Sequence, residues 1–125
     1  MRFHHIGKVV KNIEQHLMHD VFSSAGEIVY DPLQDANLYL IPQGDISIEL
    51  VQPMSERSKT YKFLMSGGGL HHICYEVDSQ EEIEKVIEER RMVRVYGPVP
   101  ALLFNSRHVT FVYSRNNELI EFLCK

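Results

Sequence analysis

Apolar and polar residues follow the same order of patterns twice along the chain. In the first half, alternation over residues 2–10 predicts a strand, and Asn12 is a favoured N-cap for the helix that follows. That helix is expected to run to about Phe22, with one apolar face formed by residues four apart: Ile13, Leu17 and Val21. Turn signals then separate three strand-like runs, at 27–32, 36–42 and 45–52.

The second half repeats this order of a strand, a helix and three strands. Alternation over residues 70–77 predicts the strand, and Ser79 with Glu82 forms a capping box that opens the helix. The predicted core face of this helix carries Ile83, Val86 and Ile87. Three strands are expected at 93–98, 109–114 and 118–124, with Gly97-Pro98 as a turn and 100–105 as either strand or packed loop.

Two short motifs recur at matching places in the two halves. His4-His5-Ile6 in the first strand returns as His71-His72-Ile73, and Ile48-Glu49-Leu50 matches Ile120-Glu121-Phe122. The repetition predicts two βαβββ modules within a single domain over residues 1–125. Module one is expected over about 1–53, a linker over about 54–69, and module two over about 70–125.

The repeated motifs place an imidazole in the first strand and a carboxylate in the last strand of each module. A lone buried carboxylate is costly, and Glu49 and Glu121 both lie within apolar runs. If the modules pack symmetrically, the four repeated side chains converge and one shared cation satisfies them all. The predicted metal ligands are therefore His5, Glu49, His72 and Glu121. Such mixed donors suit a divalent cobalt, nickel, manganese, zinc or iron ion, without selecting among these metals.

The other histidines have simpler interpretations, since a single strand histidine is more often a hydrogen-bonded structural residue than a metal ligand. His4 and His71 lean towards the opposite face of their strands, so both are expected to be structural. The remaining histidines, expected to be ordinary surface residues, are His16, His19 and His108.

Composition and charge argue against several classes of partner. The formal net charge is -4 and the basic residues are scattered, so neither nucleic acid nor an anionic membrane is expected as a partner. The longest apolar runs fall far short of the roughly 20 residues that a membrane-spanning helix needs. Cys74 and Cys124 have no zinc-finger spacing, and the first residues are unlike a signal peptide, which favours a cytoplasmic protein.

Four segments carry a resemblance to a known family, in the order HHIGKVVKNIE, SIELVQP, KFLMSGGGLHHICYEVD and ELIEFL. The chain resembles the vicinal oxygen chelate superfamily of glyoxalases, bleomycin resistance proteins and dioxygenases, and within it methylmalonyl-CoA epimerases most. The resemblance implies a glyoxalase-like α+β fold, in which two paired βαβββ modules form a curved mixed β-sheet cleft with the helices outside. It also implies the same metal ligands that the repeat indicates: His5, Glu49, His72 and Glu121.

The function that this resemblance implies is a metal-dependent isomerase or epimerase. Such an enzyme removes an α-proton from a small-molecule substrate, for example an acyl-CoA thioester, and the metal stabilises the enolate. Glu121 is then a candidate general base. The second catalytic glutamate of the family is replaced by Gln34, and the alternatives Asp35 and Glu27 fit exposed turn residues better. Cations that suit either coenzyme A phosphates or solvated surface are Arg57, Lys59, Lys62 and Arg107.

Two other functions fit the same resemblance. One is a lyase like glyoxalase I, which uses the same metal ligands with a glutathione pocket. The other is a non-catalytic small-molecule-binding protein, a class whose members usually lack the metal ligands. Strand edges and the resemblance favour a homodimer in each case, although one chain supplies both modules.

Overall fold

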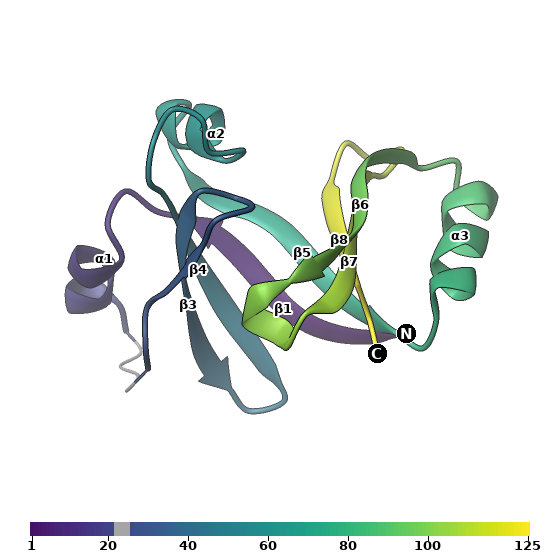
Figure 1. Cartoon of the computed structure of the whole chain (residues 1–125), viewed down its shortest axis with the longest axis horizontal. Helices are drawn as coiled ribbons and strands as arrows, with labels where there is room; N and C mark the ends of the chain where they lie inside the picture. Colours follow the sequence, from purple (N-terminus) through teal and green to yellow (C-terminus); the bar gives the residue numbers. More distant parts are fainter. Residues whose placement is uncertain (22–25) are drawn as a thin grey trace. The chain divides into compact units, whose positions relative to one another are not determined.

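The computed structural model describes residues 1–21 and 26–125, which form two compact units. The central unit is Ile6–His71, and the terminal unit combines Met1–His5 with His72–Lys125. Strands β1 (Arg2–Val9) and β5 (Gly69–Val77) therefore each contribute residues to both units. Along the chain, a strand, a helix and three strands occur twice, on either side of one short helix (Figure 1).

The central unit contains antiparallel strands and two short helices. Its complete strands are β2 (Val29–Asp31), β3 (Ala36–Gln43) and β4 (Ile46–Pro53), and they pair in the order β2-β3-β4. The helices are α1 (Ile13–His19) and α2 (Tyr61–Met65). Ile13 of α1 has no exposed surface and packs against Tyr39, Ile41 and Leu50, so the alternating apolar residues of β3 and β4 form the core beneath this helix.

Helix α1 begins where the sequence predicts and ends earlier. The side chain of Asn12 accepts a hydrogen bond from the Gln15 amide at 2.9 Å, so the predicted N-cap is confirmed. The helix ends at His19 because the backbone becomes extended at Asp20. The prediction that Val21 lies on the core face is wrong, since this side chain is 87% exposed beyond the last turn. The predicted end near Phe22 lies outside the described residues.

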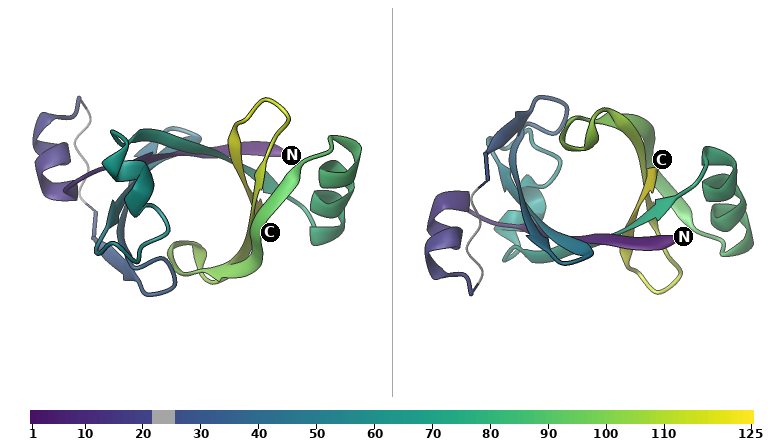
Figure 2. Two further views of the ribbon diagram at one scale, coloured as in Figure 1. Left: turned by 90° about the horizontal axis from the view of Figure 1, so that it is seen from above. Right: turned by 90° about the horizontal axis from the view of Figure 1, so that it is seen from below.

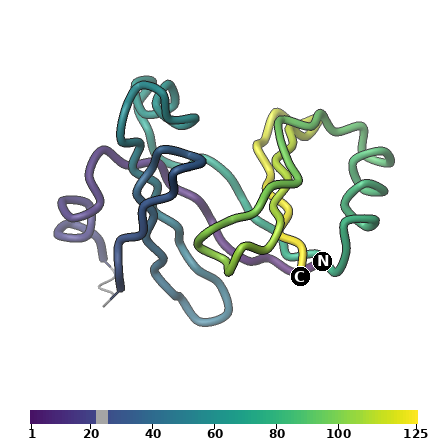
Figure 3. Tube along the Cα trace, viewed as in Figure 1, coloured from purple at the N-terminus to yellow at the C-terminus, as the bar shows by residue number. Residues whose placement is uncertain are grey.

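The terminal unit contains the second set of elements. They are α3 (Gln80–Glu89), β6 (Val93–Ala101), the 3-10 helix η1 (Leu102–Phe104), β7 (Arg107–Tyr113) and β8 (Leu119–Cys124). Strand β5 pairs parallel with β8, and β8 and β6 each pair antiparallel with β7. The Cα trace in Figure 3 follows this path from β5 through α3 to β8.

Helix α3 lies beside the strands of the terminal unit (Figure 2). Its apolar side chains pack against one face of these strands. Its predicted cap is confirmed, because the Ser79 hydroxyl accepts a hydrogen bond from the Glu82 amide at 3.2 Å. Its predicted core face is confirmed as well, since Ile83 is fully buried and Val86 and Ile87 pack around it. The core that these side chains contact is Val77, Val112 and Phe122.

The order and pairing of these elements confirm the expected α+β fold of two βαβββ modules. Parallel pairing of β5 with β8, among otherwise antiparallel neighbours, makes the terminal unit's sheet mixed. Within the described ranges, no helix has both the length and the apolar character needed to cross a membrane.

Strand β6 departs from the prediction, because Gly97-Pro98 is not a turn and the strand continues to Ala101. The register with β7 shifts on both sides of Tyr96, as at a β-bulge, and residues 102–104 form the 3-10 helix η1. Gly97 has φ +101°, and a Cβ there would lie 2.9 Å from Thr110 Cα and nearer still to the Val109 carbonyl oxygen. Close approach of β7 therefore requires glycine at this position.

We predict that Gly97→Ala lowers the free energy of unfolding by about 2–4 kcal/mol, from the combined cost of backbone strain and overpacking. The matched control is Gly44→Ala, at φ +61° with nothing within 4 Å of the added Cβ, where strain alone costs about 1 kcal/mol. Urea unfolding followed by circular dichroism measures both values. Equal losses in the two variants would contradict the close approach of β7.

A buried carboxylate joins three strands of the terminal unit. The Glu76 side chain on β5 accepts hydrogen bonds from Arg2 of β1 at 3.0 Å and from Arg107 of β7 at 2.7 Å. Burial raises the pKa of Glu76, but these hydrogen bonds and the two positive charges outweigh burial, so its pKa lies below the ordinary value. The ionised form is therefore favoured in the folded protein.

We predict that Glu76→Gln lowers the free energy of unfolding at pH 7 by about 1–3 kcal/mol, because charged hydrogen bonds are lost. A carboxylate with a depressed folded pKa stabilises the fold above its unfolded pKa, and this stabilisation disappears as the pH falls through the folded pKa. The difference between wild type and Glu76→Gln should therefore shrink below about pH 4.5. Unfolding titrations between pH 7 and pH 3 test this dependence, with Glu89→Gln, at an exposed position of α3, as the control.

Candidate metal centre

Three of the four predicted ligands lie together in the terminal unit. His5 comes from β1, His72 from β5 and Glu121 from β8. Because Cys74 is the register partner of Glu121, the alternate residue His72 points to the same face as Glu121. All three side chains are buried, with exposed fractions of 0% for His5, 6% for His72 and 4% for Glu121.

The polar atoms of these three side chains approach one another closely. The Nε2 atoms of His5 and His72 are 3.3 Å apart, and His72 Nε2 is 3.3 Å from Glu121 Oε2. His5 Nε2 is 3.9 Å from Glu121 Oε1. Two ligands that each lie about 2.1 Å from a common metal ion are separated by about 3.0–3.4 Å. The two shorter separations fall in that range, so these atoms are spaced like ligands of one ion.

Burial makes the ionised form of Glu121 unfavourable. Burial raises its pKa to about 8, although a hydrogen bond from the Cys74 thiol acts in the opposite direction. Its Oε1 atom is buried and makes no hydrogen bond with any residue in the described ranges. An unsatisfied buried carboxylate oxygen beside two imidazoles fits a cation, which would complete its coordination and favour its ionised form.

The His5 imidazole is in the protonation state that metal binding requires. Burial, with a smaller contribution from His4, lowers the pKa of His5 to about 3. The His5 ring is therefore neutral at pH 7 and keeps a lone pair on one nitrogen. A neutral imidazole is the form in which histidine binds a divalent ion. The donor set of two nitrogens and one carboxylate thus fits a divalent transition metal.

Aromatic rings surround the imidazoles and were missed in the sequence analysis. Phe104 of η1 stacks on His5, with ring centroids 5.2 Å apart and an interplanar angle of 23°. Phe111 of β7 contacts His72 edge-on at 5.3 Å. The apolar–polar alternation of β7 could have shown which face Phe111 lies on. Phe104 lies in the short helix η1, whose sequence has no such periodic pattern. These ring contacts restrict the orientation of both imidazoles.

Glu49, the fourth predicted ligand, belongs to the central unit. It lies on β4, opposite Leu40 of β3, and is 5% exposed. Its burial agrees with the expectation that an apolar strand would enclose this carboxylate. Its participation in the metal centre stays a prediction.

The remaining histidines differ in their surroundings. His4 Nδ1 lies 2.8 Å from His5 Nδ1, and His71 contacts the Phe63 ring edge-on at 4.8 Å. His19 and His108 are exposed, as predicted. The prediction for His16 was incomplete, because its side chain is only 27% exposed and pairs with Asp20 at 3.1 Å.

Two of the residues considered for a second acid or base, Gln34 and Asp35, lie in a turn of the central unit. The Gln34 side chain donates a hydrogen bond to Asp31, and Asp35 accepts hydrogen bonds from Tyr30 and from Ser55. The hydrogen bonds from Ser55 and Tyr30 lower the pKa of Asp35. Asp35 is therefore an ionised turn residue whose carboxylate accepts two hydrogen bonds. Glu27 is exposed.

The cations considered for coenzyme A phosphates fall into two groups. Arg107, in the terminal unit, is engaged with Glu76 and with the Cys124 carbonyl oxygen at 3.0 Å. The others lie in the central unit and are exposed: Arg57, Lys59 and Lys62. Arg107 thus serves a structural role in the terminal unit.

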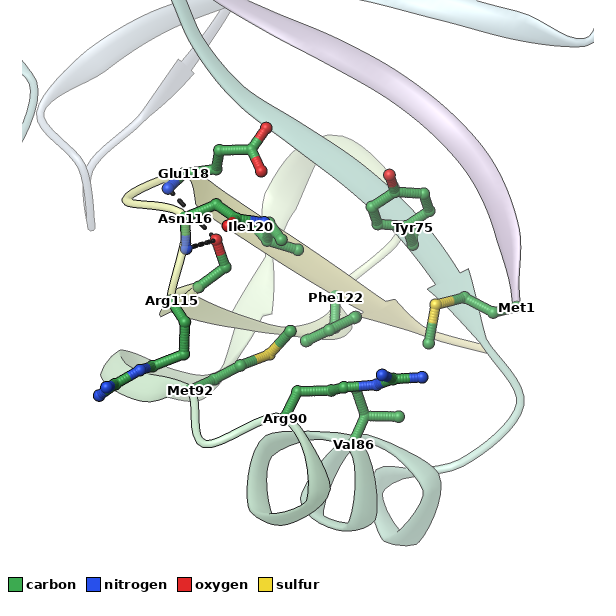
Figure 4. A pocket seen from close by; sticks show the side chains of 11 residues that line it. Met1, Tyr75, Val86, Arg90, Met92, Arg115, Asn116, Glu118, Ile120 and Phe122 are labelled. Carbon is green, nitrogen blue, oxygen red and sulfur yellow. Dashed lines mark hydrogen bonds between the residues drawn. The ribbon is translucent and has the colours of Figure 1, made fainter.

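A pocket of about 450 Å³ lies elsewhere in the terminal unit, between α3 and the strands (Figure 4). Tyr75, Ile120 and Phe122 line it from the sheet, and Val86 and Met92 line it from α3 and the following loop. Side chains alternate along a strand, so these residues point away from the face of Cys74 and Glu121. The pocket is therefore separate from the face that carries His72 and Glu121.

Comparisons with known proteins identify the relatives of this chain. Over 78 residues it is 35% identical to the mitochondrial methylmalonyl-CoA epimerase of Dictyostelium discoideum, a match that spans 59% of this chain and 46% of that relative. A hypothetical protein from Bacillus halodurans C-125 is 30% identical, with a TM-score of 0.84 over 99% of this chain and 94% of that chain. Streptomyces coelicolor methylmalonyl-CoA epimerase, in a variant complexed with 2-nitronate-propionyl-CoA, is 19% identical, with a TM-score of 0.82 over 100% and 94%.

The match to that Streptomyces structure shows a shared fold, while the family assignment comes from the sequence. Residues 4–111 match the sequence model of the Glyoxalase/Bleomycin resistance protein/Dioxygenase superfamily. This segment includes both His-His-Ile motifs and most of each βαβββ module. The chain therefore belongs to the Glyoxalase/Bleomycin resistance protein/Dioxygenase superfamily.

Proposed function

We propose that this protein is a metal-dependent isomerase of the methylmalonyl-CoA epimerase type. The observation that carries the proposal is the buried group of His5, His72 and Glu121, in which one carboxylate oxygen has no hydrogen-bond partner among the described residues. Relatives named as epimerases support the class of reaction. An acyl-CoA thioester with a substituent at carbon 2 is the proposed substrate.

The proposed ligand set is His5, Glu49, His72 and Glu121, with the first, third and fourth drawn from the terminal unit. Glu49 is included because it occupies in the first module the place that Glu121 occupies in the second. Cobalt, nickel, manganese, zinc and iron all accept two imidazoles and two carboxylates. When bound, such an ion stabilises negative charge on the thioester oxygen of the enolate.

Glu121 is the proposed proton acceptor. The Oε1 atom of Glu121 would leave the bound ion to accept the proton, and burial, which raises the pKa of this carboxyl group, favours that transfer. The carbon–hydrogen bond breaks, the proton moves to Oε1, and the electron pair moves to the thioester oxygen. Water delivers a proton to the opposite face of the carbon, which inverts its configuration, and Glu121 returns the proton it accepted to water. The ring contacts of His5 with Phe104 and of His72 with Phe111 hold both imidazoles in position throughout.

Three further properties belong to the same proposal. Cys74 and Cys124 are free thiols, which suits a reducing cytoplasm. Strand β2 is an edge of the central unit and β6 an edge of the terminal unit, and such edges favour assembly into a homodimer. Arg57, Lys59 and Lys62 form an exposed cationic segment suited to coenzyme A phosphates.

We predict that the purified chain binds one divalent ion, and that His72→Ala and Glu121→Gln weaken Co²⁺ binding by at least about 100-fold, since each removes a ligand. Glu49→Gln tests the fourth ligand and should weaken binding by about 10–100-fold. Isothermal titration calorimetry with Co²⁺ and elemental analysis measure the affinities and the stoichiometry. His108→Ala, an exposed residue of β7, is the control and should bind as the wild type does.

A wild-type chain that takes up no metal from this series would reject the proposed centre. It would favour a non-catalytic small-molecule-binding protein. Unchanged affinity in Glu49→Gln alone would remove only Glu49 from the ligand set.

We predict that the Co²⁺-loaded protein exchanges the α-proton of methylmalonyl-CoA with deuterium in deuterated water. Glu121→Gln, at saturating Co²⁺, should reduce the exchange rate by about 10²–10⁴-fold because the amide accepts no proton. Mass spectrometry of the recovered thioester follows the exchange. Metal-loaded protein that leaves methylmalonyl-CoA unexchanged but converts methylglyoxal with glutathione would instead identify a lyase like glyoxalase I.

A further inference from the structure

His4 and His5 are adjacent in sequence, and their rings meet side by side. The Nδ1 atoms of the two rings are 2.8 Å apart, which is the distance of a hydrogen bond. A neutral imidazole carries one proton, so one of these nitrogens donates and the other accepts. The direction of this bond decides which nitrogen of His5 keeps its lone pair.

We propose that His4 is a positioning residue: its Nδ1 accepts the Nδ1 proton of His5 and so keeps the Nε2 lone pair of His5 available for the metal. The inference rests on the proposed metal centre. His5 Nε2 is the atom that faces His72 and Glu121, at 3.3 Å and 3.9 Å. If the bond ran the other way, neutral His5 would carry its proton on Nε2 and could not bind an ion there.

The packing around the pair keeps this geometry. Phe104 lies flat on the His5 ring and meets the His4 ring edge-on, with centroids 5.3 Å apart and an interplanar angle of 88°. One aromatic side chain therefore restricts both imidazoles. Histidine ligands commonly donate their second N–H to a carboxylate, a backbone carbonyl or water, which fixes the tautomer. Here a second imidazole occupies the place of that acceptor.

A second metal site at the same place is the competing interpretation. The ligand atoms of His4, His5 and Cys74 all lie within 4.8 Å of one another. However, two nitrogens bound to one tetrahedral ion are expected about 3.4 Å apart, and the observed separation of 2.8 Å is shorter. The Cys74 thiol also interacts with Glu121. The hydrogen bond between the rings therefore explains the geometry better than an ion does.

The test measures the tautomer of His5 directly, by long-range ¹H–¹⁵N NMR of the metal-free protein. We expect the proton on Nδ1 in the wild type and in His4→Asn, because the Asn side-chain oxygen can replace the acceptor. His4→Leu has no acceptor and should shift the proton towards Nε2. Phe104→Leu is the packing control, which perturbs both rings but keeps the hydrogen bond, and it should retain the proton on Nδ1.

Titration with Co²⁺ then separates positioning from packing. His4→Leu should weaken Co²⁺ binding by about 10–100-fold, and His4→Asn should restore the affinity to within about threefold of the wild type. A proton found on Nε2 of His5 in the wild type, or full affinity in His4→Leu, would overturn the role of His4 while leaving the metal centre intact. Absence of Co²⁺ binding in the wild type would instead reject the metal centre, and the role of His4 with it.

Discussion

A carboxyl group enclosed with two imidazoles is the constraint on which the terminal unit's chemistry depends. Glu121 is buried, its Oε1 lacks a hydrogen bond within the described part of the chain, and the Nε2 atom of His5 lies 3.9 Å from this oxygen. A fold keeps such an arrangement only if some interaction offsets the loss of hydration. Aromatic and aliphatic side chains surround the group. A positive charge placed there therefore interacts more strongly with the carboxylate than it would at the surface.

The strands that carry this group have two separate tasks. On β5 and β8, one set of alternate residues packs beneath α3, and the other set presents His72, Cys74 and Glu121. The parallel register fixes Cys74 opposite Glu121, so the thiol reaches the carboxyl group without a specialised loop. Side chains held on paired strands are located more firmly than side chains on loops.

Local signals made much of this arrangement predictable. Asn12 and Ser79 were identifiable as caps because their hydrogen bonds involve residues three positions away, and the repeated motifs identified the strands of His5, His72 and Glu121. Features that depend on distant neighbours were not predictable. Gly97 lies within a strand because β7 approaches it, a contact that no local pattern records. The contact between His4 and His5 was missed because alternation places adjacent strand residues on opposite faces. The two side chains nevertheless orient so that their Nδ1 atoms approach each other.

The division of β1 between the two compact units limits how this protein could be separated into parts. Residues 1–5, which include Arg2 and His5, belong with the second half of the chain, and residues 6–9 of the same strand belong with the first half. A polypeptide made from the second half alone would lack both the guanidinium that binds Glu76 and one imidazole of the buried group. A cut between the two halves of the sequence therefore cannot yield a terminal unit that keeps the complete buried group.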